Sequence, residues 1–107
     1  MVVPEIGVDE LAQRVAAGEF LLDVRQPDEY VSGHVPGAVL IPLADVPAAV
    51  DRLPADGPVL VICRSGARSL TAAEFLVGTG LDAINVTGGT LAWIDSGRDV
   101  VAGAEPT

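Results

Sequence analysis

The sequence predicts an α/β fold of three layers, in which a central, mainly parallel sheet of about five strands carries helices on both faces. Short apolar runs typical of strands alternate with segments of helical apolar spacing, as in βαβ units. The run at 59–62 is apolar without interruption, which is expected of a strand covered on both sides. The 107 residues suffice for one hydrophobic core, so we expect a single domain over 1–107.

The first elements follow from local patterns. Apolar residues recur at helical spacing over 8–15, with Asp9 as the expected cap and Gly18 as the stop. An apolar run at 20–24 reads as a strand. Residues 27–32 read as one or two helical turns, because a proline opens the segment and two acids follow it.

The middle of the chain is rich in proline. A second strand is predicted at 38–41, and five of the eight prolines lie in 36–58. We therefore expect short elements there, with a helix near 46–53, before the strong strand at 59–62.

The last third repeats the alternation. Helical spacing covers 70–77, a last strand is predicted at 83–86, and a short helix at 90–95 carries Trp93 as a core anchor. We expect residues 99–107 to form a loose tail.

Charge and cysteine content restrict the function. The net charge is −9, with 15 acids against six bases, so neither nucleic acid nor an anionic membrane surface is an expected partner. The longest apolar stretch, 35–50, is broken by prolines and predicts no membrane helix. The one cysteine forms no internal disulfide, and with no signal peptide in sight we expect a cytoplasmic protein.

Cys63 directly follows the buried strand at 59–62. Ligands of parallel α/β sheets bind beyond the carboxyl ends of the strands, which is where this cysteine is expected. Ser65 and Gly66 let the backbone curl so that N–H groups point inward, and a helix expected to begin near Ser69 adds partial positive charge.

Two arginines, Arg64 and Arg68, flank this curl in an otherwise acidic chain. Together with the N–H groups they favour a thiolate on Cys63, which is the nucleophilic form, and an anionic substrate beside it. A lone cysteine at a strand end is more often an inert small hydrophobe, and the surrounding loop is what favours the reactive interpretation.

Four segments, in order along nearly the whole chain, resemble the single-domain rhodaneses, the thiosulfate sulfurtransferase family. They are LDVR at 22–25, EYVSGHVPGA at 29–38, VICRSGARS at 61–69 and GGTLAW at 88–93. The resemblance implies a rhodanese-like fold, with Cys63 as the catalytic residue. It implies a substrate cradle made by Arg64, Ser65, Gly66, Ala67, Arg68 and Ser69, the two arginine side chains being candidates for the sulfonate end of the donor.

The implied reaction moves a sulfane sulfur from thiosulfate or a similar donor to a thiol, a protein cysteine or cyanide, through a persulfide on Cys63. It requires no cofactor and no metal. A second interpretation stays open, in which the domain is non-enzymatic and acts as a sulfur relay or a protein-interaction module.

Two other enzyme classes have similar cysteine loops and suggest substrates other than thiosulfate. Cysteine phosphatases, and arsenate reductases with the same loop, place five residues between Cys and Arg, whereas Arg68 follows Cys63 after four and Ser69 stands at the phosphatase position. Mercaptopyruvate sulfurtransferases tend to carry Gly-Ser-Gly after the cysteine, and Arg64 departs from that pattern. An inorganic oxyanion donor is therefore favoured.

Other polar residues are interpreted as structural. Asp23 and Arg25 are expected to form ion pairs with their neighbours or with Glu29 at a strand end. His34, the only histidine, lies in a glycine-bearing turn where an imidazole fixes backbone groups, and a preformed thiolate needs no general base.

Overall fold

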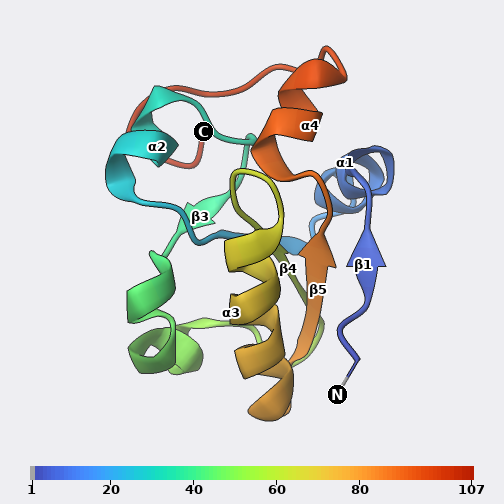
Figure 1. The fold of residues 1–107 in the computed structure, drawn as a ribbon, viewed down its shortest axis with the longest axis vertical. Coiled ribbons are helices and arrows are strands. Elements are labelled where there is room, and N and C mark those ends of the chain that lie inside the picture. The colour runs from blue at the N-terminus through green and yellow to red at the C-terminus, as the bar shows by residue number, and fades with distance from the viewer. Residues whose placement is uncertain (1) are drawn as a thin grey trace.

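Five parallel strands form one sheet, in the order β1-β5-β4-β2-β3 (Figure 1). The structure is a computed structural model that describes residues 2–107. Its strands are β1 (Glu5–Ile6), β2 (Phe20–Asp23), β3 (Val39–Leu40), β4 (Pro58–Ile62) and β5 (Asp82–Val86). The predicted α/β class with a parallel five-stranded sheet is confirmed, and β1 is an addition that the sequence analysis missed.

Helices cover both faces of this sheet. They are α1 (Val8–Ala16), α2 (Pro27–Ser32), α3 (Ala67–Gly78) and α4 (Gly89–Asp95), with two 3-10 helices, η1 (Leu43–Asp45) and η2 (Pro47–Arg52). One buried cluster packs α3 and η2 against one face, and a second packs α1, α2 and α4 against the other. In Figure 1, α3 lies in front of the sheet. The three predicted layers are therefore present.

The central strand explains the uninterrupted apolar run. All four residues 59–62 are fully buried in β4. Val59 and Val61 belong to the cluster beneath α3, whereas Leu60 and Ile62 belong to the cluster on the other face. Because side chains of a strand alternate between faces, a strand covered on both sides must be apolar at every position.

Three boundaries differ from the predictions. Helix α1 begins at Val8 after Gly7, so Asp9 lies in the first turn and is not the cap. The predicted helix at 46–53 is the 3-10 helix η2, confined between Pro47 and an extended Leu53 that precedes a proline. Helix α3 begins at Ala67, two residues before the expected start, because Gly66 turns the chain at once into the helix.

Residues 99–107 are not a loose tail. His34 and Val101 exchange both of their backbone hydrogen bonds, each 2.9 Å long. Further backbone bonds join Gly103 to Val31 and Gly37 to Pro106. The segment has no helix and so shows no periodic signal in the sequence, but these bonds hold it along α2 and the turn that follows.

Over the described residues 2–107, no helix combines the length and the apolar character needed to cross a bilayer.

Candidate active site

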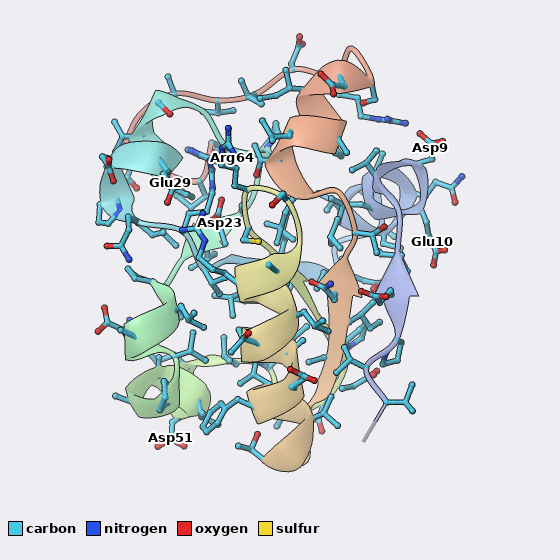
Figure 2. The ribbon with its side chains drawn as sticks, viewed as in Figure 1. Asp9, Glu10, Asp23, Glu29, Asp51 and Arg64 are labelled. Atoms are coloured by element: carbon cyan, nitrogen blue, oxygen red, sulfur yellow. The ribbon has the colours of Figure 1, made fainter. Side chains whose placement is uncertain are left out.

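The loop that carries Cys63 lies at the carboxyl edge of the sheet. Cys63 follows β4, which is the middle strand, and the chain reaches α3 at Ala67. Figure 2 shows Arg64 on this loop, with Asp23 and Glu29 on the side of α2. Gly66 has a φ of +113°, which favours glycine, and this backbone turn bends the loop into the helix.

Two groups donate hydrogen bonds to the sulfur. The backbone N–H of Gly66 lies 3.1 Å from the Cys63 Sγ, and the Ser69 hydroxyl lies 3.3 Å from it. Both donors come from the segment that turns into α3. The sulfur thus has one backbone donor and one side-chain donor, both from residues 66–69.

These donors change the acidity of the thiol. Burial, with only 1% of Cys63 exposed, acts to raise its pKa. The Ser69 hydroxyl and the backbone N–H groups of Ser69, Gly66 and Ser65 outweigh burial, so that the pKa of Cys63 lies below its ordinary value. A thiolate is therefore favoured by hydrogen bonds and not by an open, solvated position.

The carbonyl groups of the loop point the opposite way, toward the start of α4. The Cys63 oxygen accepts from the Thr90 N–H at 2.9 Å and from the Thr90 hydroxyl at 3.1 Å. The Arg64 oxygen accepts from the Leu91 N–H at 3.1 Å. Because these carbonyls are held outward, the loop is free to turn its N–H groups toward the sulfur.

Close contact between the loop and α4 requires the second glycine of the Gly-Gly turn. Gly89 has a φ of +59°, and a Cβ placed there would lie 2.5 Å from the carbonyl oxygens of both Cys63 and Arg64. No ordinary side chain fits at that distance. The Gly-Gly segment is thus the surface on which the loop rests.

Arg68 is bound to α2. Its guanidinium donates to both carboxylate oxygens of Glu29, at 2.8 and 2.9 Å. The hydrogen bond to Arg68 is the main cause that lowers the pKa of Glu29 to about 2, and the same bond raises the pKa of Arg68. Arg68 therefore ties α3 to α2. Its guanidinium, which was predicted as a candidate for the sulfonate end of the donor, is engaged by the Glu29 carboxylate.

Arg64 is exposed and lines a depression beside the loop. The depression, of about 230 Å³, lies between α2, α4 and the C-terminal segment. Its lining includes Arg64, Glu29, Thr90, Leu91, Ile94 and Val100. Among residues 2–107 no ion pair is formed by the Arg64 guanidinium, so this cation is available to an anionic ligand.

Three polar residues predicted as structural are held within the protein, but Asp23 and Arg25 pair with each other and not with Glu29, which is bound by Arg68. Arg25 donates to both oxygens of the fully buried Asp23 carboxylate and to the Gly33 carbonyl oxygen. His34 is fully buried and its two ring nitrogens face the carbonyl oxygens of Tyr30 and Pro106. Neither nitrogen is directed at the cysteine.

The loop predicted from the sequence therefore surrounds the Cys63 sulfur with Gly66 and Ser69, whereas the Arg68 side chain is bound to α2. The Ser69 hydroxyl was not predicted as a donor to the sulfur. A signal existed, because Ser69 lies on one buried face of α3 with Ala72, Ala73 and Leu76 and is the only polar member of that stripe.

Comparison with known proteins agrees with this geometry. The family model described as a rhodanese-like domain matches residues 7–96. A sulfurtransferase of Allochromatium vinosum is 38% identical over 103 residues, which cover 94% of this chain and 96% of that protein.

Solved structures are similar over almost the full length. A rhodanese-related protein of Thermoplasma volcanium has a TM-score of 0.87 and 34% identity, covering 95% of this chain and 99% of its own. A rhodanese-like domain protein of Staphylococcus aureus has a TM-score of 0.83 and 30% identity, covering 94% and 98%. With its fold, its cysteine loop and its Gly-Gly turn all accounted for, this chain belongs to the rhodanese-like domain family.

Proposed function

We propose that this protein is a sulfurtransferase that carries sulfur as a persulfide on Cys63. The observation that carries the proposal is the hydrogen bonding of the Cys63 sulfur by the Gly66 N–H and the Ser69 hydroxyl. Both donors favour the thiolate that attacks, and both can hold the terminal sulfur anion of a persulfide. The sulfurtransferase name of the Allochromatium relative supports the same reaction class.

The first step takes sulfur from thiosulfate or a similar donor. The Cys63 thiolate attacks the sulfane sulfur, a new S–S bond forms, and the S–S bond of the donor breaks. Sulfite leaves with the electron pair of the broken bond. Arg64 is the cation free to bind the sulfonate end, because Arg68 is paired with Glu29.

The second step returns the enzyme to its starting state. The thiolate of a small thiol or of a protein cysteine, or cyanide, attacks the terminal sulfur of the persulfide; a new bond to that sulfur forms, the S–S bond to Cys63 breaks, and the Cys63 thiolate leaves. No proton has to be moved by a general base if the thiolate is preformed, and His34 is buried with its ring nitrogens facing carbonyl groups. The reaction as written uses only the cysteine and its loop.

The test is a mass measurement on the intact protein. Incubation with thiosulfate is expected to add the mass of one sulfur atom and to release one equivalent of sulfite, and cyanide is expected to remove the sulfur as thiocyanate. Cys63 is the only cysteine, so the adduct is assigned without ambiguity. Cys63→Ser is the control and should acquire no sulfur.

Two outcomes would change the proposal. Absence of both the adduct and sulfite would reject thiosulfate as the donor. Uptake of sulfur from a protein persulfide, with negligible turnover of thiosulfate, would favour the relay function over the enzyme.

A further inference from the structure

Asn85 is a buried polar residue that stands between Glu5 of β1 and the apolar residues of the central strands. It lies on β5, is 1% exposed and pairs in register with Val61 of β4. Ile84 and Val86 face the cluster beneath α1 and α4. Since strand side chains alternate, Asn85 points to the opposite face, where the cysteine loop meets α3.

The Asn85 side chain connects β1 to that loop. Its Nδ2 donates to the Glu5 Oε2 at 2.8 Å and to the Gly66 carbonyl oxygen at 3.3 Å. Both partners are acceptors, so the NH2 group and not the oxygen of the amide must face them. Gly66 is the residue whose own N–H lies 3.1 Å from the Cys63 sulfur.

The amide oxygen of Asn85 has no hydrogen-bond partner among residues 2–107. A buried acceptor without a partner costs free energy, which an apolar residue at this strand position would avoid. The two hydrogen bonds donated by the Asn85 NH2 group are therefore the contacts that an apolar residue at this position could not make.

We propose that Asn85 is a positioning residue for the cysteine loop: oriented by the Glu5 carboxylate, it holds the Gly66 carbonyl so that the Gly66 N–H stays directed at the Cys63 sulfur. The first-turn bond from the Leu70 N–H to the same carbonyl, at 3.2 Å, fixes that oxygen from the helix side. With the oxygen held from two directions and φ at +113°, little freedom is left to the Gly66 N–H. The lowered pKa of Cys63 depends in part on this N–H.

The inference concerns the site of the proposed function, yet its test needs no sulfur transfer. Alkylation of Cys63 by iodoacetamide, followed against pH, reports the thiolate directly. An unchanged alkylation profile would therefore contradict only the positioning role of Asn85, and failure of the thiosulfate reaction would contradict only the proposed function.

The test compares a substitution on β5 with one at the residue that follows β5. Asn85→Ala removes the tie between Gly66 and Glu5. Thr87→Val, the matched control, removes the Thr87 hydroxyl bond to the Ile6 carbonyl oxygen, which is 3.1 Å long and also joins the end of β5 to β1 but does not reach the loop.

Asn85→Ala is expected to raise the midpoint of the alkylation profile by about half a pH unit, slowing alkylation about threefold below both midpoints. Thr87→Val should leave the midpoint unchanged. Equal midpoints for wild type and Asn85→Ala, or equal shifts in the two variants, would overturn the proposal.

Glu5 offers a second route if Asn85→Ala does not fold. Glu5 is exposed, so its substitution leaves no cavity. Glu5→Ala removes the acceptor that orients the amide and should raise the midpoint, whereas Glu5→Gln keeps an acceptor and should remain near wild type. An unchanged midpoint in Glu5→Ala, or the same shift in both variants, would count against the positioning role.

Discussion

The Ser69 hydroxyl is the side-chain donor to the Cys63 sulfur, at 3.3 Å, and it leads the hydrogen bonds that lower the Cys63 pKa against burial. We expect Ser69→Ala to raise that pKa by about one unit, since a hydrogen bond to a charged group contributes about 1.5 kcal/mol or more. The rate of iodoacetamide alkylation against pH measures the shift.

Ser65 provides a matched control for that prediction. It lies in the same loop and is exposed. Its backbone N–H helps to lower the pKa of Cys63, and alanine retains that N–H. Ser65→Ala should therefore have the wild-type profile. If Ser69→Ala had it too, the hydroxyl would have no part in holding the thiolate.

At the scale of residues, the sequence predicts which residues of one continuous segment act together. Cys63 and its loop form one uninterrupted segment, so their grouping follows from order alone. The contact between Glu29 and Arg68 spans 39 positions, and that between Gly66 and Asn85 spans 19. No local pattern encodes such pairs, because they arise only when separate elements pack together.

Helices α2 and α3 are joined by the ion pair of Glu29 with Arg68. Because Arg68 lowers the pKa of Glu29 from 4.5 to about 2, the pair stabilises the fold above about pH 4.5, and this contribution is lost as pH falls through about 2. Both side chains are partly exposed, so solvent screening limits the pair to about 1 kcal/mol. We expect Glu29→Gln to be less stable by about that amount at pH 7.

Urea unfolding at several pH values tests this dependence. The difference between wild type and Glu29→Gln should close as the pH is lowered from 4.5 toward 2, since protonated Glu29 resembles the amide. Glutamine retains the side-chain acceptor for the Gln26 N–H at the start of α2. A difference independent of pH would mean that the loss is not electrostatic. Glu10→Gln, in the exposed pair with Arg14 on α1, serves as the control.

The close approach of α4 to the cysteine loop depends on Gly89. Gly89→Ala would combine a left-handed backbone with a Cβ 2.5 Å from two carbonyl oxygens, and we expect a loss of about 3 kcal/mol in the free energy of unfolding. Gly97→Ala has a similar backbone, with φ at +84° and nothing within 4 Å of the new Cβ. It should lose only about 1 kcal/mol. Equal losses in thermal or urea unfolding would show that contact with the loop is unimportant.

Elements were predictable in proportion to their length and burial. The strand β4 was expected from its uninterrupted apolar run, and the helix α3 is long enough for helical periodicity to show. The two-residue strand β1 is defined by pairing with β5 and not by its own composition. In the proline-rich segment the predicted helix is only the short 3-10 helix η2, because Pro47 starts it and Leu53, which precedes Pro54, is extended.

In the whole molecule, the site is enclosed by parts distant in sequence. The cysteine loop rests on α4, Arg68 reaches α2, and Val100 of the C-terminal segment lines the depression beside Arg64. Parallel strands bring these parts to one edge, since all carboxyl ends point the same way. The order of strands and helices thus predicts that the site lies at the carboxyl edge of the sheet. The position of residues 99–107 beside the site depends on contacts that no sequence periodicity predicts.

Removal of residues 101–107 tests whether that segment is part of the folded body. It would delete the paired bonds of Val101 with His34 and the Pro106 oxygen, which accepts from the Gly37 N–H and faces the His34 ring. Asp99 would stay as the acceptor for the Trp93 indole N–H, so α4 keeps its anchor. We expect a loss of about 2 kcal/mol and a thermal midpoint lower by about 10 °C.

The cysteine loop should be unaffected by this truncation, because no hydrogen bond joins residues 101–107 to residues 63–69 within the described chain. The alkylation profile of Cys63 is therefore expected to match that of the full chain at temperatures where both are folded. Deletion of Thr107 alone is the control and should leave the thermal midpoint unchanged, because Thr107 is exposed. An unchanged midpoint on removal of 101–107 would mean that this segment contributes nothing to stability, whereas a shifted alkylation profile would reveal coupling between the segment and the site that hydrogen bonding alone does not carry.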